Sequence, residues 1–195
     1  MRAFLALPPD PAWTESARGL VAGLQPRLPP ASWTRPETWH LTLKFLGEIP
    51  ADAAAAFAGA LEAEMGGISI GPLPPGGPVL LPPRGRPRVL GIGFSRSPAL
   101  DALAGLARAA DAAGRRIGVT PEKREFRPHV TLARLRESWP PAAVETFVAE
   151  ARARDFPEWS VRRCVLYRSE LLPAGAAHTA VREWELETSG AEVRA

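Results

Sequence analysis

The sequence predicts an α+β fold built from two similar lobes, and two observations support this prediction. Strand-like apolar runs alternate with alanine-rich helical stretches, and several strands lie close enough in sequence to form antiparallel pairs. In addition, a strand-loop-helix unit of the first half of the chain recurs in the second half. Such a duplication commonly yields two lobes related by an approximate two-fold axis, so we expect a cleft between them.

The N-terminal elements are indicated by apolar runs and helix-capping residues. Residues 2–7 form an apolar run that is far too short for a signal peptide or a membrane span, and they predict a first strand. A helix at 11–25 is indicated by Asp10 at its start and Pro26 after its end. After a Pro-rich loop, the apolar run 40–46 predicts the next strand.

The remaining elements alternate in the same way. A long alanine run predicts a helix at 51–65. Apolar runs bounded by Pro- and Gly-rich loops predict strands at 79–81 and 88–95, and a helix follows at 98–113. The C-terminal part is expected to contain a strand at 129–135, a helix at 140–154 and strands at 160–167 and 179–187, followed by a frayed tail.

The tetrapeptide His-x-Thr-x begins at His40, in the first of two equivalent strands. Successive side chains of a strand point to opposite faces, so we expect His40 and Thr42 on one face. Leu41, Leu43 and Phe45 are expected on the other face. A polar face costs free energy unless it is solvated or hydrogen-bonded, which indicates a cleft rather than a core.

The same tetrapeptide begins again at His129, with Thr131 on the same predicted face. The similarity extends over residues 40–48 and 129–137, and each segment is followed by a proline that opens an alanine-rich helix. A single histidine in a strand is more often structural than catalytic. Repetition with the same spacing and context favours function.

These motifs resemble those of the RNA 2′,3′-cyclic phosphodiesterases, which are two-histidine phosphoesterases also called bacterial 2′-5′ RNA ligases. The resemblance rests on residues 1–8, 39–47 and 127–134 and spans nearly the whole chain. It implies a bilobal two-histidine phosphoesterase fold, in which antiparallel-rich sheets with outer helices surround a central cleft. We expect one such domain over residues 1–195.

The resemblance implies hydrolysis of RNA 2′,3′-cyclic phosphate ends to 2′-phosphates, with weak reversible 2′-5′ ligation. This reaction needs a base, an acid and donors to the phosphate oxygens, and an imidazole with a pKa near 6.5 can serve as either acid or base. The resemblance assigns His40 as proton donor and His129 as proton acceptor, although the reverse order stays open. The hydroxyls of Thr42 and Thr131 are expected to bind the phosphate. Neither a metal nor a cofactor is expected.

Arg134 matches the arginine that follows the second motif in the family, and it is expected to contact the phosphate through its planar guanidinium. By strict alternation, Arg134 faces away from His129, so this role requires a twist, a bulge or a strand end. Arg127 and Lys44 fit the alternation better and rank below it as phosphate contacts.

The other chemically interesting residues point to no further site. His178 has no threonine two positions on and lies among small residues, so it is predicted to be a loop residue without a role. Cys164 is predicted to be buried in a strand, and a single cysteine excludes an internal disulfide. A zinc site would need more Cys or His ligands, and the serine-hydrolase elbow and the P-loop motif are absent.

The net charge of +3 and the isoelectric point near 9.7 fit an anionic partner. Arginines at 84–88 and 115–124 are candidate RNA contacts, while Phe4, Phe45 and Trp39 are candidates for stacking on a base. The expected partners are RNA ends or small cyclic nucleotides, with no membrane involved. We expect a cytoplasmic monomer.

Two alternatives remain at this stage. The chain could hydrolyse the cyclic phosphate of a small nucleotide, or it could be a nucleotide- or RNA-binding module without turnover. The two intact His-Thr pairs argue against the binding module, because binding alone requires no proton-transfer groups. The basic loops favour RNA over a small substrate.

Overall fold

The computed structural model describes residues 1–172 and 175–187. Its elements, in chain order, are β1 (Arg2–Leu7), α1 (Pro11–Leu24), β2 (Ser32–Trp33), the 3₁₀ helix η1 (Pro36–Thr38), β3 (Leu41–Glu48), α2 (Ala51–Met65), β4 (Pro75–Leu81), β5 (Val89–Phe94), α3 (Pro98–Arg116), β6 (His129–Arg134), α4 (Pro141–Ala153), β7 (Arg163–Leu172) and β8 (Gly175–Glu185). The predicted α+β class is confirmed. The last hairpin differs most from the prediction, because β7 extends past residue 167 and β8 begins before residue 179. The predicted frayed tail lies outside the described residues.

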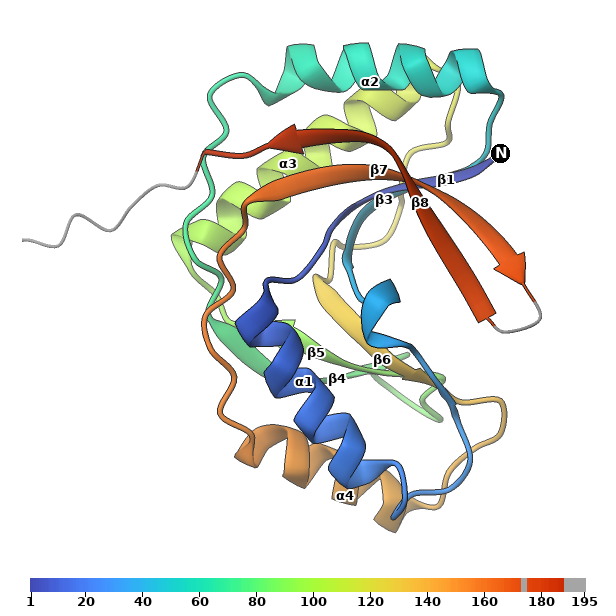
Figure 1. Ribbon diagram of the computed structural model, residues 1–195, viewed down its shortest axis with the longest axis vertical. Helices are drawn as coiled ribbons and strands as arrows, with labels where there is room; N and C mark the ends of the chain where they lie inside the picture. The colour runs from blue at the N-terminus through green and yellow to red at the C-terminus, as the bar shows by residue number, and fades with distance from the viewer. Residues whose placement is uncertain (173–174, 188–195) are drawn as a thin grey trace, which may run out of the picture.

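The strands form one sheet that is almost divided in two. Its order is β4-β5-β6-β3-β1-β7-β8, with β2 added to β6. The strands within each half pair over several residues, whereas β3 and β6 are joined by the single pair Leu41 and Val130. We call β3, β1, β7 and β8 the first lobe and β4, β5, β6 and β2 the second lobe (Figure 1).

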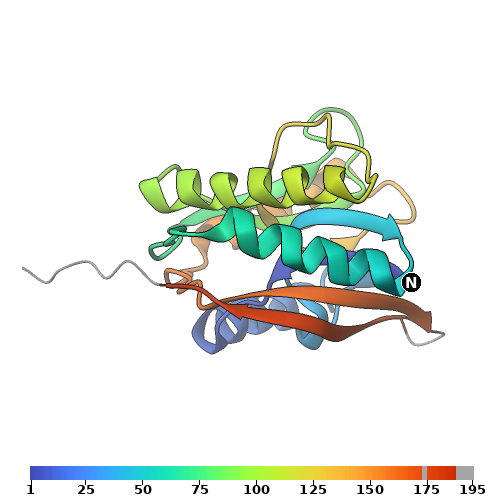
Figure 2. The same ribbon diagram turned by 90° about the horizontal axis from the view of Figure 1, so that it is seen from above.

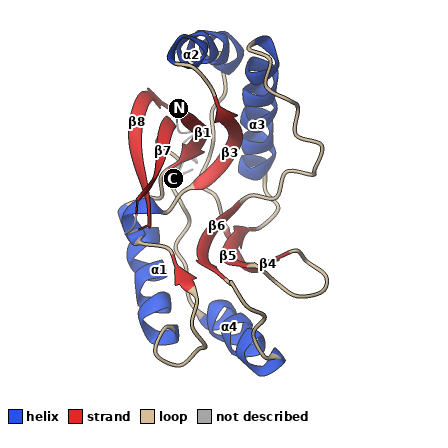
Figure 3. Cartoon of the chain, turned by 90° about the vertical axis from the view of Figure 1, so that its right-hand side faces the viewer, coloured by secondary structure: helices blue, strands red, loops and turns tan. Residues whose placement is uncertain are grey.

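Two of the helices, α1 and α3, cross from one lobe to the other. Helices α2 and α3 cover the first lobe and α1 and α4 cover the second, as Figures 1 and 3 show. Since α1 follows β1 and α3 follows β5, each of these helices leaves the lobe of its preceding strand. Trp13 of α1, for example, has its ring centroid 6.4 Å from that of Phe94 in β5 and 5.6 Å from that of Trp159. Asp10 caps α1 as predicted, by accepting from the Trp13 amide at 2.8 Å.

A β-bulge in β3 changes which side chains share the face of His40 and Thr42. Thr42 pairs with Ala6 of β1 and Lys44 pairs with Leu5, so Leu43 has no partner of its own. Such an extra residue reverses the alternation that follows it. The prediction that Phe45 shares the buried face of Leu43 is therefore wrong, and Phe45 is 56% exposed.

An equivalent bulge lies in β6. Thr131 pairs with Gly91 of β5 and Ala133 pairs with Leu90, so Leu132 is the extra residue. Leu132 and Ala133 are both buried, and Arg134 after them is exposed. The bulge that Arg134 requires in order to share the face of His129 is thus present, and Arg134 and Phe45 occupy equivalent positions in the two repeats.

Candidate active site

The two motifs meet at the junction of the lobes. Because Leu41 and Val130 are directly opposed in an antiparallel pair, the register places His40 opposite Thr131 and Thr42 opposite His129. Leu41 and Val130 are fully buried, and the four polar side chains lie on the other face, where they are partly exposed. Directly opposed residues have Cβ atoms about 5 Å apart. The His-Thr pairs therefore form one patch with approximate two-fold symmetry.

Both imidazoles are oriented by the same backbone contact. His40 Nδ1 lies 2.7 Å from the carbonyl oxygen of Thr38, and His129 Nδ1 lies 2.7 Å from that of Arg127. A carbonyl can only accept, so Nδ1 carries the hydrogen in each ring. The free nitrogen of each neutral ring is then Nε2, which can accept a proton and, once protonated, donate it.

Burial makes both histidines hard to protonate. It lowers the pKa of His40 to about 4, despite the Thr38 carbonyl, and the neighbouring His178, Arg134 and His129 lower it further. Burial also lowers the pKa of His129, where Arg134 acts in the same direction and the Arg127 carbonyl opposes it. In the free protein at pH 7 both rings are therefore neutral. A bound anionic phosphate would raise both pKa values.

The three residues predicted to contact the phosphate lie in different surroundings. Arg134 is exposed, and its charge acts on both imidazoles, which agrees with a place beside them. Arg127 pairs instead with Glu125 at 3.3 Å. Lys44 is only 5% exposed and donates to Asp111 Oδ1 at 2.6 Å, so the alternation that placed it with His40 is wrong because of the bulge.

Aromatic side chains form a wall beside His40. The Phe4 ring centroid is 4.7 Å from that of His40 and 6.1 Å from that of Phe45. Phe4 and Trp39, two of the three candidates for base stacking, are 3% and 4% exposed and belong to the core. Phe45, in contrast, has an exposed ring next to Phe4, as a stacking surface must.

His178 is placed differently from the prediction. It lies in β8 rather than in a loop, and its ring centroid is 5.3 Å from that of His40 with the two rings nearly perpendicular. The prediction missed this contact because it started the last strand at residue 179. Because β8 begins at Gly175, His178 is part of the first lobe and lies next to His40.

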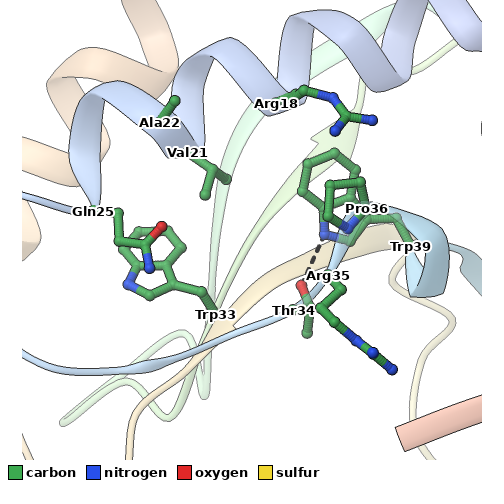
Figure 4. A pocket seen from close by; sticks show the side chains of 9 residues that line it. All are labelled: Arg18, Val21, Ala22, Gln25, Trp33, Thr34, Arg35, Pro36 and Trp39. Carbon is green, nitrogen blue, oxygen red and sulfur yellow. Dashed lines mark hydrogen bonds between the residues drawn. The ribbon is translucent and has the colours of Figure 1, made fainter. Parts of the chain in front are cut away.

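A second residue that sequence reasoning missed is Thr34. It lines a hollow of about 280 Å³ between α1 and residues 33–39, shown in Figure 4. Its hydroxyl accepts from Trp39 Nε1 at 2.8 Å and lies 2.7 Å from the carbonyl oxygen of Thr131. Thr34 thus connects the residue before His40 with the backbone of the second motif, and no sequence pattern indicated it.

Most arginines of the basic loops are already paired. Arg115 pairs with Asp111, Arg116 with Glu64 and Arg124 with Glu122. Arg88 donates to the carbonyl oxygen of Arg136. This leaves Arg84 and Arg86, which are exposed in the loop between β4 and β5, as the better candidates for RNA contacts.

Three further expectations concern chemistry away from the cleft. Cys164 is buried in β7 as predicted, and burial raises the pKa of its thiol. Within residues 1–172 and 175–187, no three His, Cys, Asp or Glu side chains are grouped as metal ligands would be. None of the helices in this described part is both long and apolar enough to span a membrane.

Comparisons with known proteins identify the family and support the fold. The family model "LigT like Phosphoesterase" matches residues 7–90 and again residues 95–178. An RNA 2′,3′-cyclic phosphodiesterase of Aquifex aeolicus (strain VF5) is 30% identical over 156 residues, which cover 79% of this chain and 81% of that protein. The crystal structure of TT0787 of Thermus thermophilus has 25% identity and a TM-score of 0.66, covering 97% of this chain and all of that one.

The crystal structure of E. coli LigT complexed with 3′-AMP, at 22% identity and a TM-score of 0.66, supports the fold; 95% of this chain and 96% of LigT are covered. The expected family and enzyme class are thereby confirmed. With two family matches that each contain one His-x-Thr-x motif, this chain belongs to the LigT-like phosphoesterase family.

Proposed function

We propose that the protein hydrolyses 2′,3′-cyclic phosphates at RNA ends to 2′-phosphates without a metal ion, with His40 and His129 as the acid-base pair. The observation that carries this proposal is the matched pair of imidazoles, each with Nδ1 held by a backbone carbonyl and each placed by the strand register opposite a threonine of the other motif. The name of the Aquifex aeolicus relative supports the substrate class.

The reaction requires two proton transfers on opposite sides of phosphorus. His129 Nε2 takes a proton from water, and the water oxygen forms a bond to phosphorus while the bond from phosphorus to the 3′-oxygen breaks. His40 Nε2 gives its proton to the departing 3′-oxygen, which leaves the phosphate on the 2′-oxygen. Thr42, Thr131 and Arg134 donate to the phosphate oxygens, where negative charge accumulates. Proton exchange with solvent restores both histidines.

The direction of proton transfer is the part of the proposal that needs a separate test. Family resemblance favours His40 as the donor, whereas the less strongly lowered pKa of His129 favours the reverse order in the free protein. A substrate with sulfur at the 3′-bridging position distinguishes these two orders of proton transfer. Because a thiol has a pKa of about 8.5, its thiolate leaves without a donated proton. This substrate should restore activity to His40→Ala and not to His129→Ala, and the opposite result would reverse the roles.

We further propose that the nucleotide lies across the two repeats. Arg134 binds the phosphate, and the exposed ring of Phe45 stacks on the base next to it, which is the usual way in which unpaired RNA bases are held. The same acid-base pair would support weak 2′-5′ ligation, with the 5′-hydroxyl of a second RNA in place of water. We propose that a monomeric single domain in the cytoplasm performs these reactions.

The proposal is tested by incubating the protein and EDTA with two substrates in parallel, a short RNA with a 2′,3′-cyclic phosphate end and a cyclic mononucleotide. Conversion of the RNA to a 2′-phosphate, identified by mass and by sensitivity to phosphatase, is expected. His40→Ala and His129→Ala serve as controls and should abolish it. Preference for the mononucleotide would transfer the assignment to a small substrate, and loss of activity in EDTA would contradict a metal-free mechanism.

A further inference from the structure

We propose that His178 is a positioning residue of the active site: its ring holds the His40 imidazole in place and keeps water away from one side of it. His178 comes from β8, which forms a hairpin with β7 and lies far in sequence from both motifs (Figures 1 and 2). This proposal rests on the proposed function only for the catalytic role of His40.

The contact between the two histidines has the geometry of an aromatic pair. Their centroids are 5.3 Å apart at an interplanar angle of 86°, an edge-to-face arrangement. Phe4 contacts both rings, at 4.7 Å from His40 and 4.9 Å from His178. His40 is therefore confined by two aromatic rings. Among the described residues, the aromatic contacts of the site involve His40 and not His129.

The strand that carries His178 is attached to the segment that orients His40. Arg35 Nη2 donates to the carbonyl oxygen of Ala176 at 3.0 Å, and Arg35 directly precedes η1. The carbonyl of Thr38, the last residue of η1, accepts from His40 Nδ1. The hairpin position and the His40 orientation are consequently linked through one short segment.

His178 contributes to the site mainly as a neutral ring. Its Nδ1 is buried without a well-formed hydrogen bond; burial lowers its pKa, the nearby Ala177 carbonyl only partly opposes this, and Arg35 lowers the pKa further. A neutral His178 shields His40 from water, and a protonated His178 lowers the pKa of His40 further through its charge.

The other ionisable groups around His40 are few. Arg134 and His129 face it from β6, and both disfavour a second positive charge. Tyr167 of β7 lies behind His178, with centroids 6.1 Å apart, and burial raises the pKa of its hydroxyl, so it is neutral at pH 7. None of these three residues depends on His178 for its position in its own strand, so removal of the His178 ring should act on His40 by hydrating it and by removing the His178 charge.

The test is a proton NMR titration of the free protein, in which three histidines give three resolvable ring signals. Spectra of His40→Ala and His129→Ala assign them. In His178→Ala the titration midpoint of His40 should rise by about one pH unit, because less burial means an easier protonation. His178→Phe keeps a ring at this position but removes the charge, so the His40 midpoint should rise less in this variant than in His178→Ala. Thr179→Ala, an exposed neighbour in β8, is the matched control.

Activity supplies the second measurement. The limb of the pH profile of kcat/KM that belongs to His40 should move with the NMR midpoint in both variants, and it should move further in His178→Ala than in His178→Phe. An unchanged His40 midpoint in His178→Ala would overturn the proposal, and so would an equal shift of His129, which indicates general loosening. Because the titration needs no substrate, failure of the proposed function would appear separately, as a wild-type protein that titrates as expected and converts no RNA.

Discussion

The two repeats share the same local backbone geometry but carry different side chains. Each places a His-Thr pair at the junction of the lobes, orients the imidazole by the carbonyl two residues before it, and follows the threonine with a β-bulge. The repeated segments thus give the two imidazoles the same orientation. This explains why a short sequence pattern identifies both halves of the site.

The repeats differ just after the bulge and in what covers the histidine. The exposed position holds Phe45 in the first repeat and Arg134 in the second, and the buried position before it holds Lys44 and Ala133. His40 is also packed more closely, so its pKa lies further below the usual value. Under the proposed function, a symmetric acid-base pair is combined with asymmetric binding groups, as an asymmetric nucleotide requires.

The largest effect should come from removing either histidine of the symmetric pair. His40→Ala and His129→Ala are each expected to lower turnover by about 10²–10⁴, the range for loss of one general acid or base. The double variant should be little worse than either single one, because the two act in one step. Single-turnover kinetics measure these effects, and a fully active single variant would contradict the paired role.

The asymmetric positions should separate binding of the phosphate from binding of the base. Arg134→Ala is expected to lower kcat/KM by about 100-fold, because a charged hydrogen-bond donor is lost, and Arg134→Lys should recover only part of it. Phe45→Ala should raise KM by about 10-fold with kcat unchanged, since stacking acts on the base rather than on the reacting phosphate. Steady-state kinetics on a cyclic phosphate lacking a base provide the control, because Phe45→Ala should not matter there.

The threonines should have smaller and similar effects. Thr42→Ala and Thr131→Ala are each expected to reduce turnover by about 10-fold, as each removes one hydroxyl donor to the phosphate. Thr→Ser should retain most activity, because it keeps the hydroxyl. Unequal losses in matched assays would indicate that the two phosphate oxygens are held differently.

The buried lysine of the first repeat should matter for stability rather than for catalysis. Lys44 donates to Asp111 Oδ1 and to the carbonyl oxygen of Thr120, linking β3 to α3 and to the segment before β6. Lys44→Ala, which copies the second repeat, should lower the free energy of unfolding by about 3 kcal/mol because Asp111 loses its partner. Urea unfolding measures this, and the double variant with Asp111→Ala should lose less than the sum of the single losses.

The pH dependence should shift on substrate binding. One histidine must be protonated, so activity falls as pH rises through its pKa, and the other must be neutral, so activity falls as pH drops through its pKa. Because burial lowers both pKa values in the free protein, the bell for kcat/KM should be centred below pH 6.5. An anionic phosphate raises both, so the bell for kcat should lie at higher pH. Coincident profiles would argue against this electrostatic coupling.

The sequence by itself determined the lobes, most of the elements and the pair of His-Thr motifs. These depend on local properties: alternation of side chains in a strand, helix capping at Asp10, and the repetition of one segment. The same local reasoning indicated that Arg134 needed a bulge in order to face His129.

Only the tertiary structure decided where the bulges lie and what packs around His40. A bulge depends on the register with a neighbouring strand, so the reversal that exposes Phe45 and buries Lys44 cannot be recognised from alternation within one strand. His178 is separated from His40 by most of the chain, and their contact exists because β8 pairs with β7 beside β1. Contacts of this kind are set by the folding of the sheet as a whole, and no local pattern encodes them.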